Sequence, residues 1–229
     1  MLLLVLEVPL SVPASPMVFC DFDGTITEED MIIAICRGFA PPEWEAIKDD
    51  ILAQRRDVRS GVAAMFGLIP SPRREDIVQF ARKTARIRAG FGELLDYCQQ
   101  VGIPFQVVSG GVDFFVYPVL EPYLAKIDRV YTIEGDFSSP TIQLRYPYGS
   151  ATSGTSKPLI LEQYREYYRI LIGDSITDLE GARIAELVFA RDRLCRYLEA
   201  EGMAYQCFET FHDVHQELER RQARGVWGS

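Results

Sequence analysis

The sequence predicts an α/β fold in which a doubly wound parallel sheet carries an inserted helical segment. Four short apolar runs alternate with helical patterns, and this alternation is typical of parallel strands joined by helices. Polar residues directly follow three of the four runs. Because right-handed crossovers place the carboxyl ends of parallel strands along one edge of the sheet, we expect these polar residues to meet there.

The first expected strand is residues 17–20, an apolar run with the length and composition of a strand buried on both faces. Runs of the same character occupy residues 103–108, 169–172 and 187–190, and helical patterns fill residues 91–101, 113–125, 158–167 and 178–186. We expect residues 17–27 and 88–229 to form one core domain around these strands.

Residues 28–87 interrupt the alternation and are expected to form a separate helical domain. This segment contains helical patterns without clear strands between them, at residues 31–38, 42–52, 58–66 and 74–84.

Two further segments stand outside the alternation. Residues 132–156 are rich in Ser, Gly, Pro and Tyr and are expected to hold a hairpin of residues 132–137 and 141–146. Residues 1–16 are interrupted by prolines, and we interpret them as a disordered tail or an extension upstream of the start site.

The composition excludes several classes of function. The chain has 229 residues with 24 Lys and Arg against 33 Asp and Glu, a formal charge of −9, and its basic residues are scattered. A nucleic-acid surface needs clustered basic residues, so no nucleic-acid partner is expected. No apolar stretch is long enough to span a bilayer, so no membrane partner is expected either. The five cysteines form no C-x-x-C pair and are odd in number, which indicates free buried thiols in a reducing compartment and a cytoplasmic location. The oligomeric state stays open.

The strongest chemical signal is the run Asp21-Phe-Asp23-Gly24-Thr25 at the end of the first expected strand. Side chains two apart on an extended chain point the same way, and Gly24 lets the chain turn directly after the two carboxylates. The alternative is a tight Asp-Gly turn within a hairpin. The residues after Thr27 have a helical rather than a strand-like pattern, which favours the paired carboxylates.

Two more strand ends carry groups suited to binding ions. Ser109-Gly110-Gly111 follows the second apolar run, where exposed N–H groups before a helix can cradle an anion; a flexible loop is the alternative. Asp174 ends the third run and Asp178 lies in the turn or helix that follows, where helix capping is the alternative.

Lys157 stands directly before Pro158 at an expected helix start. A cation is unfavourable at the positive end of the helix dipole, so a charge partner is expected for it. An ordinary surface lysine is the alternative. Its place in a loop aimed at the same sheet edge as the carboxylates favours a functional role.

These signals, in chain order, resemble the four motifs of the haloacid dehalogenase superfamily of aspartyl-phosphate phosphatases: Asp21/Asp23, Ser109, Lys157 and Asp174/Asp178. The resemblance implies a Rossmann-like core, a helical cap at residues 28–87 and a Mg²⁺-dependent phosphomonoester hydrolase. A carboxylate and a phosphate ester repel each other, so a divalent cation and a lysine are needed where they react. Mg²⁺ prefers the oxygen ligands that this set supplies.

The same resemblance implies a role for each residue. Asp21 would be the nucleophile that forms an aspartyl-phosphate, and Asp23 the general acid and base. The other implied roles are substrate binding by Ser109, Gly110 and Lys157, metal binding by Asp21, Asp23 and Asp174, and support of the metal site by Asp178.

Three stretches resemble the methionine-salvage phosphatase family more closely, namely residues 39–44, 65–70 and 109–118. This resemblance implies a small phosphorylated metabolite as the partner, 2-hydroxy-3-keto-5-methylthiopentenyl-1-phosphate. A thioether-bearing phosphate would need an apolar pocket under the cap. The candidates are Trp44, Phe66, Phe114 and Phe115, with simple core packing as the alternative.

Two other functions stay open. Asp30 occupies the place where phosphoserine phosphatases carry an acidic amine-binding residue, so phosphoserine or another small metabolite is the alternative substrate. The alternative of another class is a non-catalytic, receiver-like domain that holds Mg²⁺ with clustered acids. Receiver-like proteins have no large insertion after the first strand, which disfavours that alternative.

Overall fold

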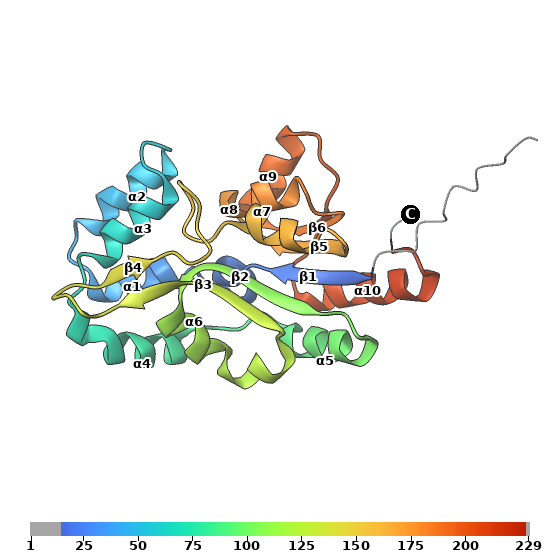
Figure 1. The fold of residues 1–229 in the computed structure, drawn as a ribbon, viewed down its shortest axis with the longest axis horizontal. Helices are drawn as coiled ribbons and strands as arrows, with labels where there is room; N and C mark the ends of the chain where they lie inside the picture. Colours follow the sequence, from blue (N-terminus) through green and yellow to red (C-terminus); the bar gives the residue numbers. More distant parts are fainter. Residues whose placement is uncertain (1–14, 228–229) are drawn as a thin grey trace, which may run out of the picture.

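The computed structural model describes residues 15–227 as a sheet with helices on both faces (Figure 1). The strands are β1 (Pro16–Cys20), β2 (Phe105–Val112), β3 (Arg129–Asp136), β4 (Gln143–Arg145), β5 (Tyr168–Gly173), β6 (Leu187–Ala190) and β7 (Gln206–Cys207). The helices are α1 (Met31–Phe39), α2 (Trp44–Leu52), α3 (Val58–Phe66), α4 (Arg74–Thr84), α5 (Phe91–Val101), α6 (Asp113–Leu120), α7 (Lys157–Leu161), α8 (Ile176–Ala182), α9 (Asp192–Ala200) and α10 (Phe211–Arg224).

The strand order across the sheet is β4-β3-β2-β1-β5-β6-β7. Every neighbouring pair is parallel except β3 and β4, which form the antiparallel hairpin expected within residues 132–146. The predicted doubly wound parallel sheet is therefore confirmed. The chain reverses its direction of travel across the sheet at β1, so the polar ends of β1, β2 and β5 lie side by side.

β1 is buried on both faces, as its apolar sequence predicts. Val18 and Cys20 pack into the core beneath α5 and α10. Met17 and Phe19 pack into the other core, beneath α7, α8 and α9. Both layers are visible on opposite sides of the strands in Figure 1. Because both faces of β1 are packed, the residue that follows the strand, Asp21, is held in a fixed position.

Several element boundaries differ from the prediction. β2 does not end at Val108 but continues through the Ser-Gly-Gly segment to Val112, with a register shift between the two. α6 ends at Leu120 and continues only as a 3₁₀ turn, because Pro122 has no N–H to extend the helix. The helices expected at residues 158–167 and 178–186 are shorter and start earlier, at Lys157 and Ile176.

The predicted N-terminal tail extends two residues too far. Pro16 belongs to β1, and the carbonyl of Ser15 accepts a hydrogen bond from the N–H of Tyr168 in β5. The rest of the predicted tail, residues 1–14, lies outside the described residues.

The helical insertion contains α1 to α4, close to the expected positions. It leaves and re-enters the core through adjacent segments, which an antiparallel bridge between Thr27 and Ile87 joins. α2 and α3 pack on each other on one side of the sheet, whereas α4 packs against α6 on the other side (Figure 1). The division of the chain into a core and a cap at residues 28–87 therefore stays a prediction.

Candidate active site

The turn after β1 brings the first motif against the end of β5. The N–H of Asp21 donates to the carbonyl of Ile172, and the chain then turns sharply through Gly24 at φ +76°. A Cβ at Gly24 would lie 2.5 Å from Oδ2 of Asp174. Glycine is required here for two reasons, the left-handed backbone and the close approach of that carboxylate.

Lys157 has the charge partners that its place at a helix start predicted. Its Nζ lies 2.8 Å from Oδ1 of Asp21 and also contacts Oδ1 of Asp178. All three side chains are at most 5% exposed. Burial alone would lower the pKa of Lys157, but the two carboxylates raise it above its usual range. The lysine is therefore a fixed cation.

Asp178 caps a helix, the alternative considered for it, while its support of a metal site stays a prediction. Besides contacting Lys157, it is the third residue of α8 and accepts hydrogen bonds from the N–H groups of Asp174 (3.1 Å) and Ser175 (3.0 Å). It caps the helix and orients the lysine at the same time.

Asp174 completes what we call the charged cluster, consisting of Asp21, Asp174, Asp178 and Lys157. Oxygens of the three carboxylates lie within 4.8 Å of one another, and Thr25 Oγ1 donates to Asp174 Oδ1 at 3.0 Å. Burial, with the Asp21 and Asp178 carboxylates, raises the pKa of Asp174 to about 8. Burial also raises the pKa of Asp21 to about 6, although Lys157 opposes that shift. Three carboxylates against one ammonium leave an excess of negative charge, so the cluster can hold a cation.

Asp23 lies beside the cluster with one oxygen unsatisfied. Its Oδ1 accepts a hydrogen bond from the N–H of Met31 (2.8 Å), whereas its Oδ2 is buried and has no hydrogen-bond partner among the described residues. Burial, together with Asp30 and Asp21, raises the pKa of Asp23 well above its usual range. The shift favours the protonated form of this carboxyl group.

Ser109 and Gly110 lie at the same edge but within β2, not in a loop after it. Ser109 is fully buried, and its Oγ accepts a hydrogen bond from the N–H of Gly111 (2.8 Å). A Cβ at Gly111 would lie 2.9 Å from Oδ2 of Asp23, so this glycine lets the strand approach the carboxyl group. Gly110 and Lys157 line a small pocket of about 20 Å³ beneath α3.

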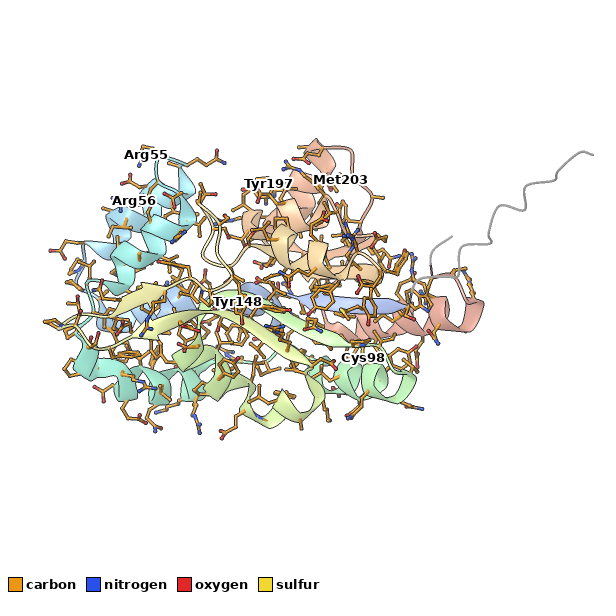
Figure 2. All side chains as sticks on the ribbon, viewed as in Figure 1. Arg55, Arg56, Cys98, Tyr148, Tyr197 and Met203 are labelled. Atoms are coloured by element: carbon orange, nitrogen blue, oxygen red, sulfur yellow. The ribbon has the colours of Figure 1, made fainter. Side chains whose placement is uncertain are left out.

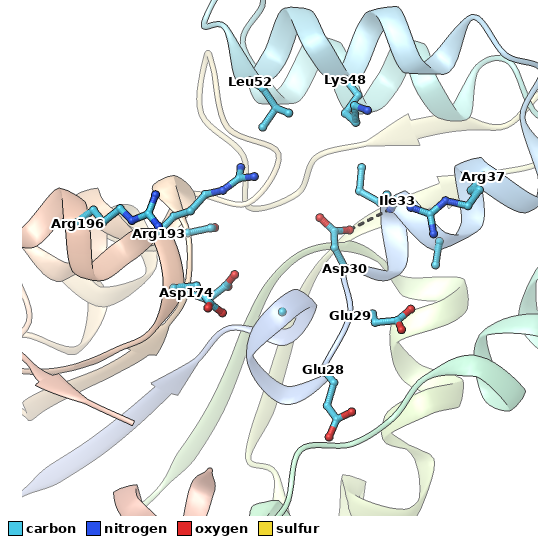
Figure 3. Close-up of a pocket in the computed structure, with 14 residues that line it drawn as sticks. Glu28, Glu29, Asp30, Ile33, Arg37, Lys48, Leu52, Asp174, Arg193 and Arg196 are labelled. Carbon is cyan, nitrogen blue, oxygen red and sulfur yellow. Dashed lines mark hydrogen bonds between the residues drawn. The ribbon is translucent and has the colours of Figure 1, made fainter. Parts of the chain in front are cut away.

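An open cleft of about 780 Å³ lies next to Asp174, between α1 and α2 on one side and α9 on the other (Figure 3). Ile33, Ala34 and Leu52 form an apolar part of its wall, and Asp30 lines it as well. Its cationic residues are Arg37, Lys48, Arg193 and Arg196. In Figure 3 the side chain of Arg193 extends from α9 toward Leu52 and Asp30.

The four aromatic candidates do not line this cleft, so that prediction is wrong. Phe66 packs with Phe114 and Phe115 at ring distances of 6.2 and 6.3 Å in the core. Trp44 is buried with Cys36 and Met65. Core packing, the alternative considered for these residues, is what the structure shows, because their helices turn these faces toward other helices.

Sequence reasoning missed Arg88, which holds the turn after β1. Its buried guanidinium donates to the carbonyls of Gly24 (2.8 Å), Thr25 (2.8 Å) and Thr27 (3.3 Å). It also missed Arg193 and Arg196. The signal for these two was present, since they closely follow the fourth predicted strand, as Asp21 and Asp174 follow the first and third.

Comparison with known proteins identifies the class to which this fold and site belong. Residues 18–183 match the family model described as haloacid dehalogenase-like hydrolase. The chain belongs to the haloacid dehalogenase-like hydrolases, as the motifs predicted, and it is a hydrolase.

Individual relatives are more specific. The chain is 47% identical to the 2-hydroxy-3-keto-5-methylthiopentenyl-1-phosphate phosphatase of Geobacillus kaustophilus (strain HTA426) over 213 residues, which cover 90% of this chain and 96% of that protein. It is 44% identical to the protein of the same name from Brevibacillus brevis (strain 47) over 217 residues, covering 92% and 98% of the two chains. The predicted resemblance to the methionine-salvage phosphatases is confirmed.

Solved structures of similar fold include a phospho-aspartyl intermediate analogue of phosphoserine phosphatase. It aligns with a TM-score of 0.67 at 17% identity over 89% of this chain and 99% of that one. A substrate-bound phosphoserine phosphatase complex aligns with a TM-score of 0.65 at 18% identity, covering 86% and 93%. At these identities the likeness concerns the fold. Within residues 15–227, no helix combines the length and apolar character needed to cross a membrane.

Proposed function

We propose that this protein hydrolyses 2-hydroxy-3-keto-5-methylthiopentenyl-1-phosphate through an aspartyl-phosphate formed on Asp21. The observation that carries the chemistry is the buried contact between Asp21 and Lys157, 2.8 Å apart at the end of the central strand. The relatives of that printed name, at 44–47% identity over nearly their whole length, support the choice of substrate.

The charged cluster fits a magnesium ion. The cluster has three acidic side chains and one ammonium, so it carries an excess of negative charge. Without a metal ion, only protons can balance that charge, and the raised pKa of Asp174 is the expected result. Oxygen ligands favour Mg²⁺ over softer metals. Asp21, Asp174 and the main-chain carbonyl of Asp23 would hold it. When bound, the ion would neutralise charge on the phosphate and polarise it toward attack.

The residues of the chain divide the reaction into two displacements. A carboxylate oxygen of Asp21 attacks phosphorus while the bond between phosphorus and the ester oxygen breaks. Asp23 gives its proton to the leaving enol or alcohol oxygen, and its raised pKa supports that role. Asp23 then takes a proton from water, which attacks phosphorus and releases phosphate and Asp21.

The phosphate group would be held by fixed donors. Lys157 offers its ammonium, and Asp178 keeps that ammonium in place. Ser109 and Gly110 lie in β2, at the same edge of the sheet as Asp23, and would bind the remaining phosphate oxygens. Because these groups are already ordered, little reorganisation accompanies charge development in the reaction.

The cleft would receive the remainder of the substrate. The apolar wall of Ile33, Ala34 and Leu52 suits a methylthioalkyl chain, and the insertion at residues 28–87 would act as the cap that carries it. Phosphoserine is the second candidate, since Asp30 lines the same cleft and can bind an amine. The five free cysteines are consistent with an enzyme of the reducing cytoplasm.

A substrate panel tests the proposal. With Mg²⁺, we expect kcat/KM for the enol-phosphate to exceed that for phosphoserine by at least about 100-fold. Asp21→Asn should abolish both activities and keep the fold, and EDTA should do the same reversibly. The control is Asp96→Asn, which changes an exposed carboxylate of α5. Full activity of Asp21→Asn would refute the nucleophile, and absence of hydrolysis of any phosphomonoester would favour the receiver-like alternative.

A further inference from the structure

Two cysteines, one on α9 and one on β7, lie in contact with each other. Cys195 lies one turn into α9, and Cys207 is the last residue of β7, paired with Ala190 of β6. Their sulfur atoms are 3.9 Å apart, which is van der Waals contact. Neither thiol belongs to the charged cluster or lines the cleft.

Accessibility separates this pair from the other cysteines. Cys207 is exposed and Cys195 is half-buried, so the prediction of buried thiols is wrong for this pair; the other three cysteines are buried. Cys98, for example, lies in α5 on the far side of the sheet from Tyr197 of α9 (Figure 2). An oxidant in solution therefore meets Cys207 first, with Cys195 directly behind it.

The electrostatic surroundings support this order. Burial raises the pKa of the Cys36 and Cys98 thiols to about 12. Burial and the neighbouring Cys207 raise the pKa of Cys195 to about 11. Because the thiolate is the reactive form of cysteine, these three thiols are poor first nucleophiles.

We propose that Cys195 and Cys207 form an oxidisable dithiol site, which a hydroperoxide converts into an intramolecular disulfide. The Cys207 thiolate attacks the peroxide oxygen, the O–O bond breaks, and hydroxide or alkoxide leaves a sulfenic acid on Cys207. The Cys195 sulfur then attacks the Cys207 sulfur. The S–S bond forms, the S–O bond breaks, and the hydroxyl leaves as water with the Cys195 proton. Two thiols lose two electrons in total, and one peroxide gains them.

The local geometry permits the bond. A disulfide needs a sulfur separation of about 2.05 Å, so the two sulfurs must approach by roughly 1.9 Å. Side-chain rotation can supply part of this movement. The connection between α9 and β7 can supply the rest. It turns at Gly202 (φ +65°), where a Cβ would meet no atom within 4 Å, so no neighbouring group blocks a small movement there.

The position of the site gives the modification a structural consequence. Cys195 lies between Arg193 and Arg196, which line the cleft. A bond to β7 would tie this wall of the cleft to the edge of the sheet. The inference goes beyond the proposed hydrolysis, and its test does not depend on that proposal.

The test is peroxide oxidation of the reduced full-length chain, followed by alkylation, digestion and mass spectrometry. With hydrogen peroxide in slight excess, we expect the intact mass to fall by two hydrogen atoms and one cross-linked peptide pair to contain Cys195 and Cys207. Two of the five thiols should disappear from a titration of the denatured protein. Dithiothreitol should restore both.

Variants identify the order of the steps. Cys195→Ser should stop at the sulfenic acid on Cys207, trapped by dimedone, whereas Cys207→Ser should slow thiol loss by at least about tenfold. Circular dichroism should show that the double variant is folded. This variant should keep its three thiols under the same treatment. A disulfide between two molecules, one that involves Cys20, Cys36 or Cys98, or a monomer oxidised without a Cys195–Cys207 cross-link would overturn the proposal.

Discussion

The charged cluster and the cleft beside it are built in opposite ways. In the cluster, Asp21, Asp178 and Lys157 are buried and already paired with one another. In the cleft, Arg193 and Arg196 make no ion pair among the residues that the structure describes, and Leu52 is 54% exposed (Figure 3). Groups that must act on a phosphate are thus ordered in advance, whereas groups that contact the rest of a ligand stay free to adapt. Substitutions in the cluster should therefore cost stability and catalysis together, and substitutions in the cleft should change only recognition.

The largest effect is expected from Lys157→Met. Removal of the ammonium leaves Asp21 and Asp178 buried without their cation, which should lower the free energy of unfolding by about 3–5 kcal/mol. Hydrolysis should fall to background. Urea unfolding and initial rates measure the two effects.

The matched control is Lys126→Met, which removes a lysine from the exposed ion pair with Asp96. Surface pairs contribute little, so the free energy of unfolding should change by less than about 1 kcal/mol, with full activity. If both variants lost the same free energy of unfolding, burial would not be what makes the ion pairs of the cluster contribute more than a surface pair.

Arg88→Met should come next in size. The variant leaves the buried carbonyls of Gly24 and Thr25 without their donor, at a cost of about 2–3 kcal/mol in the free energy of unfolding. Because this turn positions Asp23, kcat should fall by about tenfold or more while KM changes little. Arg86→Met is the control, since Arg86 is exposed and its ion pair with Glu29 is long, at 3.8 Å. A rise in KM with kcat intact would contradict a role for Arg88 in positioning Asp23.

The cluster could be predicted from the sequence because its residues follow strands. Asp21 and Asp174 stand directly after apolar runs, and parallel topology alone brings such positions together. The partner of Lys157 was foreseen for a local reason, the helix dipole, and the structure supplies two carboxylates. The first inference needed only the order of the elements, and the second only the local sequence at a helix start.

What could not be predicted depends on contacts between distant segments. Arg88 acts through carbonyls more than 60 residues earlier in the chain, and no local pattern marks it. The sequence spacing of Phe66 and Phe114 fits the wall of a pocket as well as a packed core, because spacing does not determine which element a helix face packs against. In the structure the two rings pack on each other. A flexible loop was the alternative considered for the segment that begins at Ser109, whereas the structure keeps this segment within β2, where the register shifts between Val108 and Val112.

Metal removal and pH should act on the cluster and leave the cleft unchanged. The pKa values of Asp174 and Asp21 in the folded chain, about 8 and about 6, lie above the unfolded value of roughly 4. Folding then binds protons, so this stabilisation is complete at low pH and is lost as the pH rises through the folded values. In EDTA, the melting temperature should fall as the pH rises from about 5 to about 8. Added Mg²⁺ should raise the midpoint more at the higher pH, where fewer protons compete.

Calorimetry of the wild type and of Asp174→Asn measures this dependence. The variant lacks the carboxyl group with the higher of the two pKa values and should respond less to both pH and Mg²⁺. A midpoint that rises over the same interval in EDTA, or a Mg²⁺ response independent of pH, would argue against a cation site at the cluster.

The smallest effect separates two exposed leucines. Leu52 of α2 lines the cleft and is 54% exposed, and Leu159 of α7 lies outside it and is 55% exposed. Leu52→Ala should raise KM for the thioether substrate by about three- to tenfold, because an apolar contact is lost, and should leave KM for phosphoserine unchanged. Leu159→Ala should change neither, and both variants should stay within about 0.5 kcal/mol of the wild type in unfolding free energy. Since the two residues are equally exposed, a difference in KM can come only from the position of Leu52 in the cleft. Identical kinetics would instead place the recognition of the alkyl chain away from α2.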